Sequence, residues 1–124
     1  MIIVRKTQMQ AMARALFEQW VQAHARQFFP DQCRSVAPGD FAVLVRNAID
    51  KAQSYGFLDQ ADCCRYVDLT LVFGAQFDVD PRFSWAGGIL GDLNFENAAM
   101  RMWALHTAAC EHESALAGKA AQHA

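Results

Sequence analysis

The chain has 124 residues, a net charge of −2 and an isoelectric point near 6.0, with 53% hydrophobic and 19% charged residues. This length and composition fit one folded domain and exclude a largely disordered chain. The weakly acidic charge provides no basic field that would attract nucleic acid or an anionic membrane. We therefore expect no nucleic-acid partner and no membrane partner.

Helical periodicity dominates the first quarter of the chain. We allow for a short extended arm over residues 1–5, after which Thr7 and Gln10 have the spacing of a capping box. Apolar residues then recur every three or four positions, which predicts a long helix with one buried face. That face comprises Met9, Met12, Ala13, Leu16, Phe17, Trp20, Val21, His24 and Phe28. Pro30 predicts that the helix ends near Phe29, because the residue before a proline disfavours helical conformation.

Two more helices are predicted in the middle of the chain. Asp40 is the expected N-cap of the first, which ends at Gly56, and Asp59 is the expected N-cap of the second, which ends at Gly74. Most positions of residues 63–73 are apolar. We therefore expect this second helix to be packed on several sides at the centre of the protein.

The last third of the chain predicts two further helical segments. Residues 85–90 are long enough for one or two turns, and Asn94 or Asn97 then caps a helix running to about Leu116. Residues 118–124 contain no large apolar side chain, so we expect a frayed tail.

The fold class predicted by these segments is all-α. We expect a compact bundle of four to five helices in a single helical domain, residues 1–117. Neither a signal-peptide-like apolar run at the N-terminus nor a stretch of about 18 apolar residues is present. Together with four cysteines that need not pair, this predicts a cytoplasmic protein with reduced thiols.

The sequence FDVDPRFSW, residues 77–85, is the candidate functional site and is called the 77–85 segment below. It combines two carboxylates, a proline and three large aromatic side chains. The candidate partner-binding residues are Phe77, Asp78, Asp80, Pro81, Phe83 and Trp85. Aromatic residues near the centre of an interface carry much of its binding energy. The alternative is that they fold back as core, with Trp85 buried and Phe83 exposed.

Two groups of residues invite a metal interpretation. Asp78, Asp80 and Asp92 could hold a hard cation, but the sequence around them favours turns in which aspartate accepts backbone hydrogen bonds. His106 and Cys110 lie four residues apart on one helix face, yet structural zinc generally takes four ligands. We therefore predict no metal and no cofactor.

Catalytic signals are equally weak. A serine or cysteine nucleophile needs a neighbouring histidine oriented by a third group, and no local sequence supplies one. The glycines at 87, 88 and 91 lack the lysine and hydroxyl residues of a phosphate-binding loop. The sequence therefore predicts a protein that is not an enzyme.

One run of residues resembles a known family. The pattern G-x-x-FD-x-DP-x-x-x-WA-x-x-IL from Gly74 to Leu90, with YGF at 55–57, MIIVRKTQM at 1–9 and FFPDQC at 28–33, is similar to a family of small uncharacterised bacterial proteins. Those proteins are commonly encoded beside type VI secretion spike and effector genes. The resemblance implies an accessory part in effector loading, delivery or neutralisation, and it carries over no catalytic residue.

The resulting functional hypothesis is a non-catalytic adaptor or co-chaperone that binds a protein from the same gene cluster: an effector, its chaperone or a spike-tip protein. An alternative is an immunity protein, because residues 52–124 carry nine acidic against four basic groups and could cover a basic toxin cleft. An alternative of another class is a small metal-dependent or hydrolytic enzyme. Self-association stays open. A binder should expose an apolar patch, whereas an enzyme should converge titratable groups in a pocket.

Overall fold

All regular secondary structure in the described backbone is helical. The computed structural model describes the backbone of residues 2–123 and the side chains of residues 7–118. Over that backbone it contains six α-helices, one 3-10 turn and no strand, which confirms the all-α prediction. The elements are α1 (Ile2–Phe28), α2 (Pro30–Arg34), α3 (Pro38–Ser54), α4 (Gln60–Phe73), η1 (Pro81–Phe83), α5 (Ser84–Leu90) and α6 (Ala98–His123).

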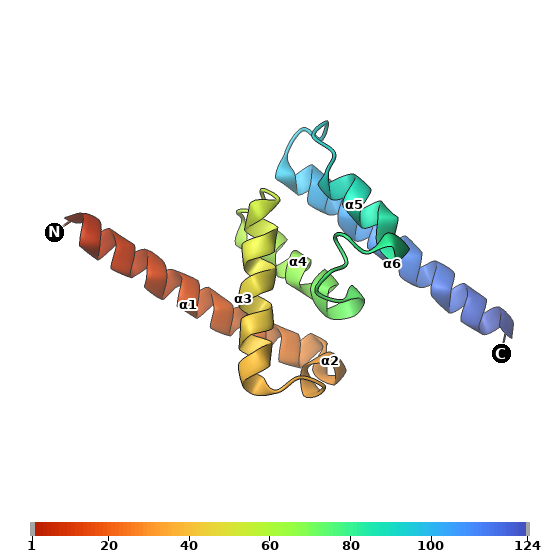
Figure 1. Cartoon of the computed structure of the whole chain (residues 1–124), viewed down its shortest axis with the longest axis horizontal. Helices are drawn as coiled ribbons and strands as arrows, with labels where there is room; N and C mark the ends of the chain where they lie inside the picture. Colours follow the sequence, from red (N-terminus) through yellow and green to blue (C-terminus); the bar gives the residue numbers. More distant parts are fainter. Residues whose placement is uncertain (1, 124) are drawn as a thin grey trace.

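Helix α4 is the centre of the structure. It contacts α1, α3 and α6, and Figure 1 shows it between α3 and α6. Its buried residues are Asp62, Cys63, Cys64, Tyr66, Val67, Leu69 and Thr70. Burial of each large side chain stabilises the fold by about 1.5–3 kcal/mol. The prediction that this helix packs on several sides is therefore confirmed.

The two longest helices, α1 and α6, extend past the others in opposite directions (Figure 1). The extended arm predicted for residues 1–5 is wrong from Ile2 onward, where α1 already begins, so Thr7 lies inside the helix. Helix α6 continues past Leu116 to His123, so residues 118–123, which were predicted to be frayed, are helical. The side chains of residues 119–124 lie outside the described residues.

Helix α1 buries only part of the predicted face. Val21 and Ala25 are fully buried, but most of the predicted stripe is exposed. Four exposed residues define what we call the α1 apolar face: Met9, Met12, Leu16 and Trp20, each 56–65% exposed. At about 100° per residue, these positions lie on roughly the opposite side of the helix from the buried pair. The prediction of a wholly buried stripe is therefore wrong.

Helix boundaries follow local capping chemistry. Asp59 caps α4 by accepting a hydrogen bond from a backbone N–H of its first turn at 3.4 Å, and Gly74 ends it with a φ of +103°, as predicted. Helix α3 differs from expectation, because its N-cap is Ala37 and Pro38 occupies the first helical position. Asp40 therefore lies within the first turn, where its charge complements the helix dipole.

Two short features complete the fold. Helix α2 was not predicted. It starts at Pro30, which was interpreted only as a helix end, although proline also suits the first turn of a helix. Asn97 caps α6 by accepting a hydrogen bond from the backbone N–H of Met100 at 2.9 Å, one of the two predicted alternatives.

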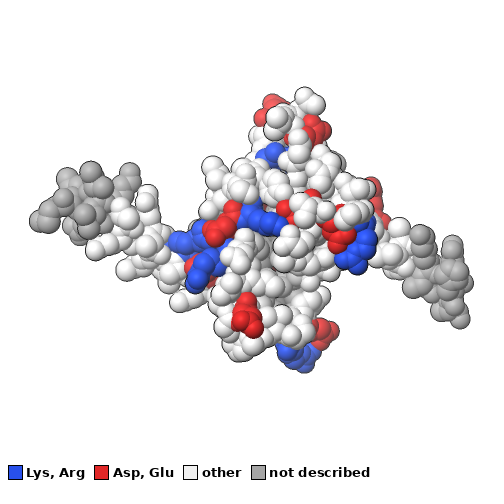
Figure 2. All heavy atoms as spheres, viewed as in Figure 1, with Lys and Arg blue, Asp and Glu red and all other residues white. Residues whose placement is uncertain are grey.

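None of the helices in the described backbone has the length of apolar sequence that a bilayer crossing requires. On the face drawn in Figure 2, Lys and Arg side chains lie beside Asp and Glu side chains instead of gathering in a patch of one sign. This face therefore presents charges of both signs in mixed order.

Candidate functional site

The 77–85 segment joins α4 to α5 and rests on a buried base. Phe77 is 1% exposed, with its ring centroid 5.1 Å from that of Tyr66, and Asp78 is 5% exposed. Pro81 is exposed and Asp80 is half-buried. The segment therefore has an inner side that belongs to the core and a short outer edge that faces solvent.

Asp78 fixes this segment to α3. One carboxylate oxygen lies 2.7 Å from Lys51 Nζ, and the other accepts a hydrogen bond of 2.7 Å from the Tyr55 hydroxyl. Lys51 Nζ also donates to the carbonyl of Ala75 at 3.1 Å. Burial by itself raises the pKa of Asp78, but the hydrogen bonds from Lys51 and Tyr55 outweigh burial and hold the pKa below its ordinary value. Asp78 is therefore an ionised anchor.

Sequence reasoning missed Lys51 and Tyr55 as parts of this site. Lys51 lies in the last turn of α3 and Tyr55, four residues later, is the C-cap of that helix, so the two side chains lie on the same side. That spacing was the only local signal, because their common partner, Asp78, follows more than twenty residues later in the chain.

Asp80 serves the segment as a local cap. Its Oδ1 accepts a hydrogen bond of 2.9 Å from the backbone N–H of Arg82, and its Oδ2 lies 2.7 Å from Arg82 Nη2. Asp92 similarly accepts from the backbone N–H of Asn94 at 2.9 Å. Asp80 and Asp92 thus accept backbone hydrogen bonds, as the turn interpretation predicts, whereas Asp78 is bound by the side chains of Lys51 and Tyr55. The three aspartates have separate partners and do not form a common cation site within the described residues.

Phe83 and Trp85 are both half-buried, so neither matches its predicted extreme. They pack with Phe73 of α4 and His112 of α6, with ring centroids 5.0 Å apart for Phe73–Phe83 and 5.7 Å apart for Trp85–His112. Trp85 Nε1 is buried and makes no hydrogen bond with any described residue. This aromatic cluster joins three elements, which limits the area that Phe83 and Trp85 can offer to a partner.

The α1 apolar face is a second candidate surface, and it lies beside a hollow. Leu16 and Trp20, with Phe17, line an open hollow of about 620 Å³ whose other wall is the start of α4, at Gln60 and Ala61. The Phe17 and Trp20 rings are stacked with their centroids 6.4 Å apart. The surface therefore combines flexible methionines, a leucine and a tryptophan beside a groove.

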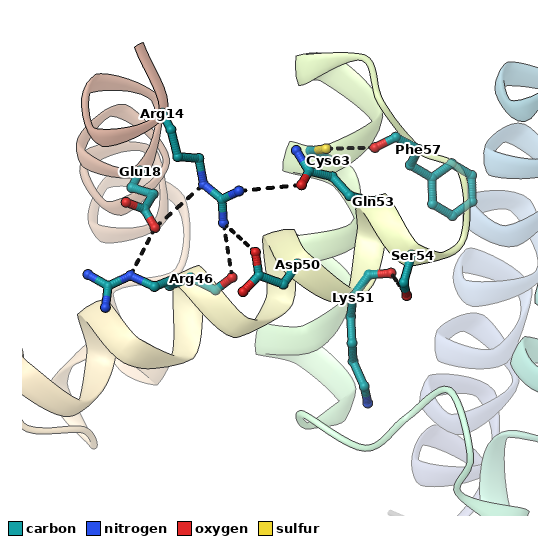
Figure 3. Close-up of polar contacts among 9 residues, drawn as sticks. All are labelled: Arg14, Glu18, Arg46, Asp50, Lys51, Gln53, Ser54, Phe57 and Cys63. Atoms are coloured by element: carbon teal, nitrogen blue, oxygen red, sulfur yellow. Dashed lines mark hydrogen bonds and ion pairs between the residues drawn. The ribbon is translucent and has the colours of Figure 1, made fainter. Parts of the chain in front are cut away.

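A polar network joins the charged side of α1 to α3 (Figure 3). Arg14 Nη2 lies 2.8 Å from an Asp50 carboxylate oxygen, and Arg46 Nε lies 3.1 Å from a Glu18 oxygen. Arg14 Nη1 also donates to Gln53 Oε1 at 3.4 Å. These contacts turn the charged side of α1 toward α3. Met12 and Leu16 lie on roughly the opposite side of the helix and are largely exposed.

One group of possible metal ligands converges among the described residues: His24 of α1 with Cys64 and Asp68 of α4. Their ligand atoms all lie within 4.8 Å of one another. Sequence reasoning treated His24 as a core residue, because nothing local connects it to α4. The pair predicted as a weak metal candidate, His106 and Cys110, is separated by 3.9 Å between Nδ1 and Sγ.

The four cysteines are free thiols. Burial, and secondarily the charge of Asp68, raises the pKa of Cys64 to about 11, and burial also raises the pKa of Cys63. A thiol with a raised pKa is largely protonated at neutral pH and is a poor nucleophile. The Cys63 thiol instead donates a hydrogen bond of 2.9 Å to the carbonyl of Phe57.

Comparison with known proteins returns no match among protein families, among curated proteins or among solved structures. The resemblance to proteins of type VI secretion loci therefore stays a prediction from the sequence.

Proposed function

We propose that this protein is a non-catalytic adaptor that holds an amphipathic helix of a partner protein on the α1 apolar face. The observation that carries the proposal is the exposure of Met9, Met12, Leu16 and Trp20 along one side of a helix. Contiguous exposed apolar side chains on a folded protein commonly mark a protein interaction site.

The chemistry of the face favours an apolar partner surface. Between Thr7 and Trp20 the charged residues are Arg14 and Glu18, and both engage α3. The remaining positions are apolar or uncharged, so a charged partner surface would gain little there. A helix that lays one apolar face into a groove fits such a surface, and methionine adapts well to the shape of a partner.

A docking role also agrees with the state of the polar groups. Asp78 is committed to Lys51 and Tyr55, and the buried thiol of Cys64 is protonated at neutral pH. In this proposal the 77–85 segment is the rigid support of the fold, and its outer edge at Asp80 and Pro81 is a secondary contact.

The family resemblance supplies the partner class for the proposal. The helix would come from a protein of the same gene cluster, namely a type VI effector, its loading chaperone or a spike-tip protein. The same proposal places the action of this adaptor in the cytoplasm, before the secretion machinery operates. Free thiols are usual in that compartment.

The experiment is co-expression of the tagged full chain with each product of the neighbouring genes, followed by affinity purification. Trp20→Ala should reduce recovery of the specific partner by about 10-fold or more, as expected for a central aromatic anchor. The matched control is Trp103→Ala on α6, because Trp103 is also largely exposed, at 67%, but lies on another helix.

Several outcomes would contradict the proposal. Equal losses for Trp20→Ala and Trp103→Ala would remove the α1 apolar face as the docking surface. A dimer of the protein alone that Trp20→Ala converts to a monomer would show that a second copy, not a partner helix, covers this face. Light scattering during size-exclusion chromatography separates these cases.

A further inference from the structure

A second feature of α1 lies closer to the body, where the helix meets α4. His24 Nε2 lies 3.3 Å from Asp68 Oδ1 and 3.4 Å from Asp68 Oδ2. Cys64 precedes Asp68 by four residues, so both side chains leave the same face of α4. An imidazole, a thiol and a carboxylate from two helices thus converge at one point.

The spacing of these atoms approaches that of a tetrahedral zinc site. With bonds of about 2.0–2.1 Å to nitrogen or oxygen, tetrahedral geometry separates two such ligands by about 3.3 Å. The distance from His24 Nε2 to Asp68 Oδ1 is already 3.3 Å. A sulfur ligand should lie about 3.6 Å from the other two, so the distance from Cys64 Sγ to each of them, now within 4.8 Å, would shorten by at most about 1.2 Å.

Independent observations indicate that the cluster has an incomplete set of partners. Asp68 Oδ1 is buried and receives no hydrogen bond from any residue that the structure describes. The His24 ring is held between Trp20 and Phe28, with ring centroids 5.5 and 4.9 Å away. Oδ1 of this carboxylate thus has room for a further partner, and the imidazole is already oriented toward the carboxylate.

We propose that His24, Cys64 and Asp68 bind one divalent transition-metal ion of the zinc class, which clamps α1 to α4. Binding takes the Cys64 thiolate as ligand and releases its proton to solvent. Asp68 also lines an open hollow of about 190 Å³ together with residues of α4 and α6. Mixed nitrogen, sulfur and oxygen ligands suit Zn²⁺ better than Mg²⁺ or Ca²⁺.

The test uses the reduced full chain, stripped of metal and titrated with Co²⁺ as a spectroscopic probe for zinc. We expect one equivalent of Co²⁺ to produce a thiolate-to-cobalt charge-transfer band, and one equivalent of Zn²⁺ to abolish it. Zn²⁺ should also raise the Tm. Cys64→Ser should lose the band. His24→Gln and Asp68→Asn should each weaken the affinity for Co²⁺ by more than about 100-fold, because loss of an outer-shell partner typically costs about 10- to 100-fold.

Cys33→Ser is the matched control, because it removes a half-buried thiol outside the cluster and should keep the band. Circular dichroism checks that each variant is folded, and His24→Gln decides the question if Cys64→Ser unfolds, since His24 is only half-buried. Absence of the band in the wild type, its persistence in folded Cys64→Ser or wild-type affinity in folded His24→Gln would overturn the proposal. None of these readouts depends on a protein partner.

Discussion

Lys51 and Asp78 form an ion pair of 2.7 Å that joins the end of α3 to the 77–85 segment, and the Asp78 side chain is only 3% exposed. The 77–85 segment therefore contains its own structural anchor, Asp78. A pair of this kind specifies the path of the chain, because an unpaired carboxylate at the same place would be buried at a cost.

The first prediction compares the two aspartates of the segment. Asp78→Asn should lower the free energy of unfolding by about 1.5–3 kcal/mol, because it removes a charged acceptor from two hydrogen bonds. Asp80→Asn should cost much less, since Arg82 is 76% exposed and its pairing with Asp80 is weakened by solvent. Urea denaturation measures both. Equal costs would mean that Asp78 does not anchor the segment.

The second prediction concerns acid. The pKa of Asp78 is held below its ordinary value in the folded protein, so its contribution to stability is present above the unfolded pKa of about 3.9 and is lost as pH falls through the folded pKa. The difference in unfolding free energy between the wild type and Asp78→Asn should therefore shrink below about pH 4. A difference that stays constant between neutral pH and pH 3, roughly one unit below the unfolded value, would contradict this assignment.

The third prediction concerns alkali and the only two tyrosines of the chain, Tyr55 and Tyr66. Burial, the hydrogen bond to Asp78 and the charge of Asp78 raise the pKa of Tyr55 to about 12, and burial raises that of Tyr66 further. The contribution of each tyrosine to stability is fully present below its pKa in the unfolded chain, about 10, and is lost as pH rises through its pKa in the folded protein. Tyrosinate absorbance should therefore show no step near pH 10 while the protein stays folded.

A titration in denaturant is the control for the tyrosines, because both phenols should then ionise near pH 10, their approximate unperturbed value. A reversible step near that pH with unchanged circular dichroism would show that at least one phenol is more accessible than its contacts indicate.

How much of this architecture was predictable depends on how local its causes are. Asp59 and Gly74 bound α4 through contacts with immediate neighbours, so capping rules located both ends. The exposed side of α1 could not be predicted in this way. It depends on which side of α1 packs against α3 and α4, and the contacts there, such as that of Arg14 with Asp50, join positions 36 residues apart.

The same distinction between local and long-range contacts applies to the candidate site. The sequence identified Asp80 as turn chemistry because its partner, Arg82, is two residues away. It could not indicate that Asp78 binds α3, nor that His24 meets Asp68 across 44 positions. Both contacts depend on how the helices pack, which no local pattern encodes.

The fourth prediction uses two neighbouring glycines of α5. A Cβ at Gly88 would meet nothing within 4 Å, so Gly88→Ala should stabilise the helix by up to about 1 kcal/mol. A Cβ at Gly87 would lie 3.1 Å from the backbone carbonyl of Asp78, a residue that Lys51 and Tyr55 already hold in place. Gly87→Ala should therefore be less stable than Gly88→Ala in thermal unfolding. Identical shifts in Tm would mean that the segment moves freely away from α5.

The last prediction tests the exposure of α1 with one substitution at two leucines. Leu105 of α6 is fully buried, so Leu105→Ala should cost about 2–5 kcal/mol of unfolding free energy. Leu16 is 60% exposed, so Leu16→Ala should change stability by no more than about 0.5 kcal/mol. Both residues lie inside helices, so the intrinsic helix preference of leucine and alanine cancels in the comparison. A large cost at Leu16, measured on the isolated protein at low concentration, would show that the α1 apolar face is already covered.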